Sequence, residues 1–327
     1  MSWRWTSTGS RSTSPAGRDV LEHPIPLIID SYTQTQDLSC PKRGGHFMLA
    51  RGMRRLMIVA FTLGLCASLA TAVGEAAPMA CSAPAVGTEP VAPGGPGWTR
   101  TFVDEFNRCG LGPNWGAYSG QPGGNTNSQW SPSMVTVSGG MLHLRAVQRE
   151  GSWITGGVAN ISAPQLYGKW EVRFRVQASD EVSFHLLLWP QANVWPPEID
   201  FLESNDGTRR SASAAVHYWG ADGSKQKTMR SVRGDFTRWT RVGVEWLPGQ
   251  VRYLLNGKVW ATASGPLVSP GIPMWLAMQI ESGACQQNAK WGILRCPSAG
   301  IPPTMQMDVD WVGVYAPASG TALLSHS

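Results

Sequence analysis

The chain has 327 residues, enough for one large domain or two small ones, and its hydrophobic content of 42% suffices for a buried core. The net charge of +5 comes mostly from residues 1–55, which hold eight Lys or Arg and four Asp or Glu. The remainder is nearly neutral and has no basic stripe, so we expect no nucleic-acid partner.

Three segments precede the globular pattern. Residues 1–50 are rich in Ser, Thr, Arg and Pro, and we interpret them as disordered or as an extension upstream of a later start codon. Residues 51–72 combine basic residues, an apolar run and a small-residue site at 70–72, which is typical of a secretory signal. Because the apolar run is short for a membrane span, we expect a secreted, extracellular protein without a stable span, with a retained anchor as the alternative. Residues 73–97 have the Ala, Pro and Gly composition of a linker.

From about Trp98 onward, short alternating or apolar runs are separated by turn residues, and no long amphipathic helix is evident. Asn256-Gly257 predicts a tight hairpin turn. So many short strands predict an all-β fold, a two-sheet antiparallel sandwich. The expected strands cover residues 134–137, 141–145, 170–176, 184–189, 212–218, 241–246, 251–255, 259–263, 274–280 and 307–315.

Of the six cysteines, four lie downstream of the predicted signal. Cys285 and Cys296 are eleven residues apart in one loop region, which favours a local disulfide. Cys81 and Cys109 remain as the second expected pair, and free buried thiols are the alternative. No Cys-x-x-Cys motif or His cluster indicates a metal.

Three acids lie inside one apolar run, Glu198-Ile-Asp-Phe-Leu-Glu203. Strand alternation places Glu198 and Asp200 on one face, and a β-bulge at Phe201-Leu202 would bring Glu203 to the same face. Three like charges on one face are costly to bury, so stability does not explain them.

The neighbours of these acids indicate a cleft. Trp189, Trp195 and several prolines crowd the run with aromatic and rigid residues, as expected where sugar rings stack. A solvated strand face is the alternative reading of the three acids.

The motif at 198–203 resembles the active-site strand of glycoside hydrolase family 16, the laminarinase-like and lichenase-like retaining β-glucanases. Other segments follow in the order usual for that family, at 103–106, 167–173, 216–219, 241–257, 273–283 and 307–315. The resemblance implies a concanavalin-like jelly-roll catalytic domain over residues 98–317. It also implies cleavage of internal β-glycosidic bonds, most often in β-1,3-glucan. Lichenan or agarose hydrolysis, transglycosylation and a non-catalytic glucan-binding sandwich are the alternatives.

The resemblance assigns roles to the three acids. Glu198 is the expected nucleophile and Glu203 the expected general acid/base. Asp200 is expected to hold Glu198 ready and to keep the proton on Glu203 in the free enzyme. The family usually has a Phe-Trp-Leu-Leu-Pro-like segment before the acids. Here the segment is Phe184-His-Leu-Leu-Leu-Trp-Pro190, in which the aromatic residue has shifted and His185 is unusual.

The resemblance also implies further contacts with a polysaccharide substrate. His217 is expected to form hydrogen bonds beside the acid/base. Trp195, Trp219 and Trp130 are candidate stacking platforms, each with core packing as the alternative, and Gln279 is a weaker candidate for a sugar hydroxyl.

We expect a monomer that requires no cofactor. Some members of the family bind calcium on the convex side, through an Asp of the closing strand, and Asp310 occupies that position. A solvated Asp near a strand is an equally good explanation of Asp310, so a structural calcium site is the weakest of these expectations.

Overall fold

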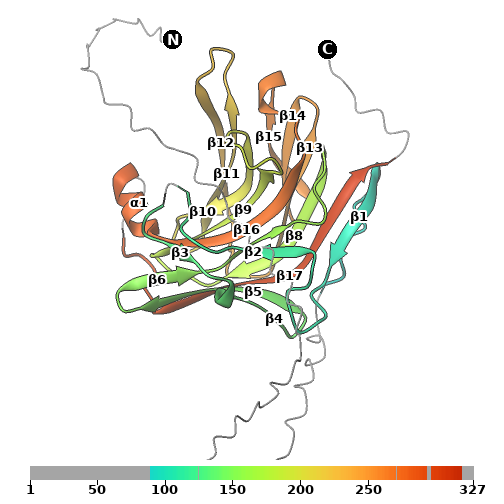
Figure 1. The fold of residues 1–327 in the computed structure, drawn as a ribbon. Helices are drawn as coiled ribbons and strands as arrows, with labels where there is room; N and C mark the ends of the chain where they lie inside the picture. Colours follow the sequence, from blue (N-terminus) through green and yellow to red (C-terminus); the bar gives the residue numbers. More distant parts are fainter. Residues whose placement is uncertain (1–88, 124, 270, 293–295, 319–327) are drawn as a thin grey trace, which may run out of the picture. The chain divides into compact units, whose positions relative to one another are not determined.

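The computed structural model describes residues 89–123, 125–269, 271–292 and 296–318 (Figure 1). The predicted signal at 51–72 and Cys81 lie outside the described residues, and so does any bond that Cys81 forms. Within the described ranges, no helix is long and apolar enough to span a bilayer.

A seven-stranded antiparallel sheet carries the three acids. Its order is β12 (Lys225–Arg233), β11 (Ser211–Trp219), β10 (Glu198–Ser204), β9 (Val182–Pro190), β16 (Met274–Ser282), β7 (Gly157–Asn160) and β2 (Trp115–Ala117). The acid strand β10 therefore lies inside the sheet, between β9 and β11, where both of its edges are hydrogen-bonded.

The other sheet has ten strands. Its order is β15 (Lys258–Ser264), β14 (Gln250–Leu255), β13 (Thr240–Leu247), β8 (Gly168–Val176), β17 (Thr304–Pro317), β5 (Met141–Arg149), β6 (Ser152–Thr155) and β3 (Gln129–Trp130), with β1 (Trp98–Asp104) on β17 and β4 (Val135–Ser138) on β5. All its pairings are antiparallel except that of β3 with β6.

The two sheets face one another and enclose one large apolar core, as Figure 1 shows. Phe174 of one sheet and Phe184 of the other meet there, with ring centroids 5.5 Å apart. Alternate residues of each strand point into this core, so the intervening residues of β10 face outward. The predicted two-sheet antiparallel sandwich is confirmed.

The turn between β14 and β15 has the predicted form. Asn256 and Gly257 have φ values of 50° and 77°. Two successive positive φ values are what a two-residue hairpin of type I′ requires, and Asn-Gly tolerates them best.

Several elements were not predicted from the sequence: the short strands β2, β3, β6 and β7, the longer strand β12 and the helix α1. Strand β12 reads KQKTMRSVR and lacks apolar alternation, and it pairs with β11 along nine residues. The helix α1 (Ala284–Trp291) follows β16 and contains Cys285, which is bonded to Cys296 as expected. Two short 3-10 turns lie at Pro132–Met134 and Pro266–Val268.

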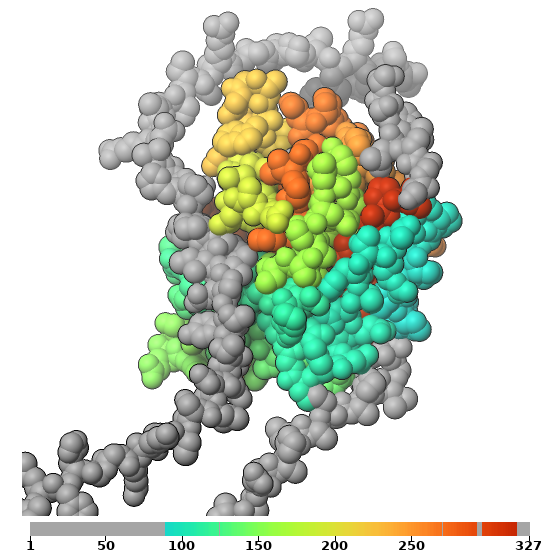
Figure 2. Space-filling model, turned by 45° about the vertical axis from the view of Figure 1, so that its right-hand side comes forward, coloured from blue at the N-terminus to red at the C-terminus, as the bar shows by residue number. Residues whose placement is uncertain are grey.

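The packed domain begins before Trp98. The Tyr315 hydroxyl donates to the carbonyl of Ala92 at 2.6 Å, and Lys169 Nζ donates to that of Gly94 at 2.9 Å. Residues 89–97, which composition assigns to a linker, thus contact β8 and β17. Figure 2 shows this N-terminal part of the described chain (cyan) beside the end of β17 (red).

Candidate active site

A bulge in β10 brings the three acids to one face. Asp200 is opposite Leu187 of β9, and the next paired residue is Leu202, opposite Leu186, so the strand has one extra residue. Phe201 and Leu202 are both fully buried. Glu203 therefore shares the outward face with Glu198 and Asp200, as the sequence pattern predicts.

Glu198 is held by the indole that precedes it. Trp195 Nε1 donates to Glu198 Oε2 at 2.8 Å. The Trp195 ring lies 5.5 Å from the ring of His217, and Lys225 Nζ is 4.4 Å from the Trp195 ring centroid. The hydrogen bond orients one carboxylate oxygen of Glu198 and leaves the other, Oε1, for chemistry.

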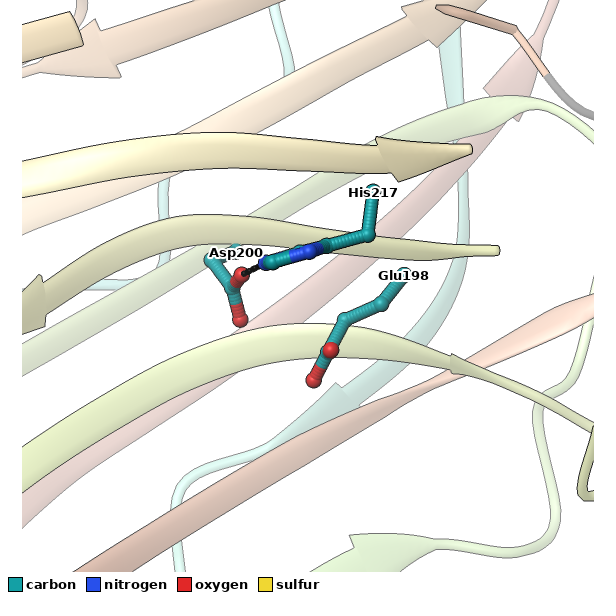
Figure 3. A group of neighbouring side chains, drawn as sticks. All are labelled: Glu198, Asp200 and His217. Carbon is teal, nitrogen blue, oxygen red and sulfur yellow. Dashed lines mark ion pairs between the residues drawn. The ribbon is translucent and has the colours of Figure 1, made fainter. Parts of the chain in front are cut away.

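Asp200 is the most buried of the three acids and pairs with a histidine. Its side chain is 5% exposed, and Oδ2 lies 3.3 Å from His217 Nε2 (Figure 3). His217 is directly opposite Glu198 in the β10–β11 ladder. The expected hydrogen-bonding role of His217 is thus directed to Asp200, the middle acid.

Glu203 has two partners on the neighbouring strands. Ser213 Oγ of β11 donates to Glu203 Oε1 at 3.3 Å, and His185 Nδ1 of β9 lies 3.4 Å from Glu203 Oε2. Both residues are opposite Glu203 in their ladders. Cross-strand neighbours of this kind are in reach because side chains of paired residues stand side by side.

Burial and mutual repulsion change how these groups titrate. Burial, together with the charge of Asp200, raises the pKa of Glu198 to about 8. Burial and the charge of Glu203 raise the pKa of Asp200 well above its usual value. Burial acts on Glu203 in the same direction, but the hydrogen bond and charge of His185, together with the charges of Lys227 and His217, outweigh it and lower the pKa of Glu203. Burial lowers the pKa of His217.

The pKa directions bear on where the proton lies in the free site. Burial and the charge of Asp200 disfavour the charged form of Glu198, whose pKa is raised, so the nucleophile reacts from its ionised fraction. The lowered pKa of Glu203 favours its charged form, which is stabilised by the hydrogen bond from His185, a residue that the family pattern does not contain.

The candidate sugar contacts differ in accessibility. Trp219 is 47% exposed at the end of β11, and Trp195 is half-buried above Glu198. Trp130 is only 4% exposed and packs against Tyr118, with ring centroids 4.9 Å apart. Of the two readings of Trp130, this burial favours core packing over a stacking platform. Gln279 is half-buried and donates to Glu281 Oε1 at 2.7 Å.

Sequence reasoning missed several residues on the same sheet face. Trp275 of β16 is opposite Trp189 of β9, and both half-buried rings pack on the cluster formed by Tyr118, Trp130, Ala159, Leu187 and Ala277. Glu281 accepts from Asn125 Nδ2 at 2.8 Å. These residues meet because β9 and β16 are neighbours in the sheet although they are far apart along the chain. A single sequence does not reveal how such distant strands are paired.

Metal binding finds little support in this part of the molecule. Among the described residues, Glu198, Asp200 and His217 are the one group of three potential ligand side chains close together. Trp195 and His217 already bond to the two carboxylates, so we assign the group to acid–base chemistry. The Asp310 carboxylate is buried and forms an ion pair with the Arg173 guanidinium, which already neutralises its charge. The arrangement does not fit a calcium site at Asp310.

The fold and the acid-bearing strand define a carbohydrate-active sandwich protein. The model of the family "Glycosyl hydrolases family 16" matches residues 123–313, and the chain belongs to this family. Two relatives in Rhizobium meliloti, the endo-1,3-1,4-beta-glycanases ExsH and EglC, are 25% and 24% identical over 250 residues. That match covers 67% of this chain and 52% of each relative, so the chain spans about half their length.

Solved structures show the same fold. The laminarinase from Rhodothermus marinus is 22% identical with a TM-score of 0.55, covering 67% of this chain and 97% of the other. The catalytic domain of an endo-1,3-beta-glucanase from Thermotoga petrophila is 18% identical with a TM-score of 0.56, covering 68% and 98%.

Proposed function

We propose that the protein is a secreted retaining endo-β-glycanase whose main substrate is a β-1,3-glucan. The observation that carries the proposal is the bulge in β10, which turns Glu198, Asp200 and Glu203 to one face and keeps their main chain inside the sheet. Retaining glycosidases need two carboxyl groups on either side of the scissile bond. The central position of β10 supplies the rigid support that such a pair requires.

In the first step Glu198 is the nucleophile. Its Oε1 attacks the anomeric carbon while Trp195 holds Oε2, and Glu203 gives a proton to the leaving oxygen. The negative charge of Glu198 is consumed as the glycosyl-enzyme bond forms. Because Glu198 ionises only with difficulty beside Asp200, forming this bond also relieves repulsion between the two acids.

In the second step Glu203 acts as the base. It removes a proton from water as the water oxygen attacks the anomeric carbon, and Glu198 leaves as a carboxylate. Asp200 touches neither reacting atom in this scheme. Its carboxylate bonds to His217, and its charge acts on Glu198.

The substrate class is supported by two kinds of likeness. The relatives ExsH and EglC are endo-1,3-1,4-beta-glycanases, and the structural neighbours include laminarinases. The half-buried Trp189 and Trp275 provide apolar surface on the same sheet face as the acids. Indole faces suit the apolar faces of sugar rings.

The test is a screen of the secreted protein against laminarin, lichenan, agarose and xyloglucan, with new reducing ends as the readout. We expect laminarin to give the highest rate. Glu203→Gln is expected to lower that rate by about 10²–10⁴-fold, the usual contribution of general acid/base catalysis. Glu150→Gln, at an exposed turn between β5 and β6, is the matched control and should retain full activity.

Three outcomes would redirect the proposal. Glucan binding without new reducing ends would indicate a binding sandwich. Longer products without new reducing ends would indicate a transglycosylase. A highest rate on another glycan would change the substrate and leave the chemistry intact.

A further inference from the structure

His185 is a titratable group on the active-site face that the mechanism above does not use. Its side chain is 18% exposed and lies between Glu203 of β10 and Gln279 of β16, both directly opposite it in the sheet. Its ring nitrogens have separate partners. Nδ1 is 3.4 Å from Glu203 Oε2, and Nε2 is 2.9 Å from Ser183 Oγ.

The hydrogen bonds are compatible with a protonated ring. The Ser183 hydroxyl lies within reach of both the Glu281 carbonyl, at 3.2 Å, and His185 Nε2, so its oxygen can accept from Nε2 when its proton goes to that carbonyl. A Glu203 carboxylate can only accept, so Nδ1 donates to it. With both nitrogens donating, the ring is an imidazolium that forms an ion pair with Glu203.

The charges around His185 support the cationic form. Glu203 and Asp200 face it from β10, and Glu281 faces it from β16. Burial opposes the charged ring, but the bond to Glu203 and these three acids prevail and raise the pKa of His185 to about 9. On the far side, Lys227 of β12 and His217 of β11 act on Glu203 itself and lower its pKa.

This pairing affects the step in which Glu203 acts as an acid. A carboxylate paired with an imidazolium has no proton to give, yet the leaving oxygen needs one. The proton is one hydrogen bond away, on His185 Nδ1. No other described residue has a ring or ammonium nitrogen within ion-pair distance of the Glu203 carboxylate.

We propose that His185 is a positioning residue that shares one proton with Glu203, so that the two side chains form the acid/base unit. The inference rests on the assignment of Glu203 as the acid/base. As the glycosidic bond breaks, the proton moves from His185 Nδ1 to Glu203 Oε2, and Glu203 protonates the leaving oxygen. The imidazole is then neutral, Glu203 is a carboxylate, and the sugar is bonded to Glu198.

The second step restores the starting state. Glu203 takes a proton from the attacking water, the bond between Glu198 and the sugar breaks, and the proton returns to His185 Nδ1. Over the cycle one water is consumed, and His185, Glu203 and Glu198 recover their initial protonation. The pair keeps a usable proton at a pH where an isolated glutamate has lost its own.

The experiment compares His185→Asn with the wild type. Asparagine can still donate a hydrogen bond to Glu203 but cannot release a proton. The measurement is the pH dependence of kcat/KM on laminarin and on an aryl β-glucoside oligomer whose leaving group needs no protonation. His143→Asn, on β5 in the other sheet, is the matched control.

For His185→Asn we expect the alkaline limb on laminarin to move to lower pH by about one unit or more, because Glu203 must then hold its own proton. The aryl substrate, which needs no acid in the first step, should lose less than about threefold in that step. A profile identical to that of the wild type would overturn proton sharing.

Two further measurements keep the outcomes distinct. If Glu203→Ala still hydrolyses laminarin, the proposed function fails. If Glu203→Ala is inactive and His185→Asn matches the wild type, only the present inference fails. Ring nitrogen NMR of the wild type requires no variant: an imidazolium at pH 7 is expected for His185, and a neutral ring would overturn the proposal.

Discussion

Replacing Asp200 by Asn tests the electrostatics of the three acids most sharply. The substitution keeps the size of the side chain and an oxygen that can bond to His217, but it removes a buried group that can ionise. A carboxylate oxygen of Asp200 and one of Glu198 lie within 4.8 Å of one another. Two unit charges at that separation interact by about 3.5 kcal/mol at an effective dielectric constant of about 20.

The direction of the pH shift follows from the causes of the raised pKa of Glu198. Burial and then the charge of Asp200 raise the pKa of Glu198. Removing that charge lets Glu198 ionise at lower pH, so the acidic limb of kcat/KM should move down by up to about two pH units. Without the charge of Asp200 the ionised form of Glu198 is more stable and therefore less reactive. Turnover should fall by about tenfold or more.

The assay is the pH dependence of turnover and of kcat/KM on one soluble glucan, for the wild type and Asp200→Asn. Asp222→Asn, at the exposed turn between β11 and β12, is the control and should change neither limb. An unchanged rate with unchanged limbs for Asp200→Asn would refute the three-carboxylate reasoning and leave Asp200 as a structural acid.

Three further predictions concern the Trp195 hydrogen bond, the disulfide and the N-terminus of the secreted protein. Trp195→Phe removes the hydrogen bond that lowers the pKa of Glu198, so the acidic limb should move to higher pH, opposite in sign to Asp200→Asn; a shift to lower pH would contradict the contact. Replacing Cys285 and Cys296 by Ser should lower the free energy of unfolding by up to about 3 kcal/mol in a denaturant titration, and an unchanged midpoint would show that the bond does not stabilise the fold. Mass spectrometry of the secreted, non-reduced protein should place its first residue near 73 with no free thiol, and a retained N-terminal segment would contradict the signal.

The sequence predicts the local features of the site well. Alternation and the run at 198–203 place three acids in one strand, and the register of β10 confirms the bulge. The Asn256-Gly257 turn was predictable because it depends on the local backbone alone. Strand β12 was not, because its polar sequence gains its place only by pairing with β11.

Contacts between distant strands account for the remaining differences. Trp130 was a candidate for sugar stacking or for core packing, and its contact with Tyr118 and its neighbouring cluster favours core packing. Asp310 was a candidate calcium ligand or a solvated residue, and in the structure the neighbouring strand supplies Arg173 as its partner. The position of His185 opposite Glu203 also depends on the bulge. None of these pairings has a signal within a few residues along the chain.

The central claim is that Glu198 is the nucleophile of a retaining glycosidase. The most direct test is the reaction of Glu198→Ala with azide and an activated β-glucosyl substrate, followed by NMR of the product. Without the carboxylate, azide can enter from the face that Glu198 occupies, and the account predicts a glycosyl azide of the α configuration, inverted relative to the substrate. A β-glycosyl azide, or native hydrolysis by Glu198→Ala without azide, would contradict the assignment.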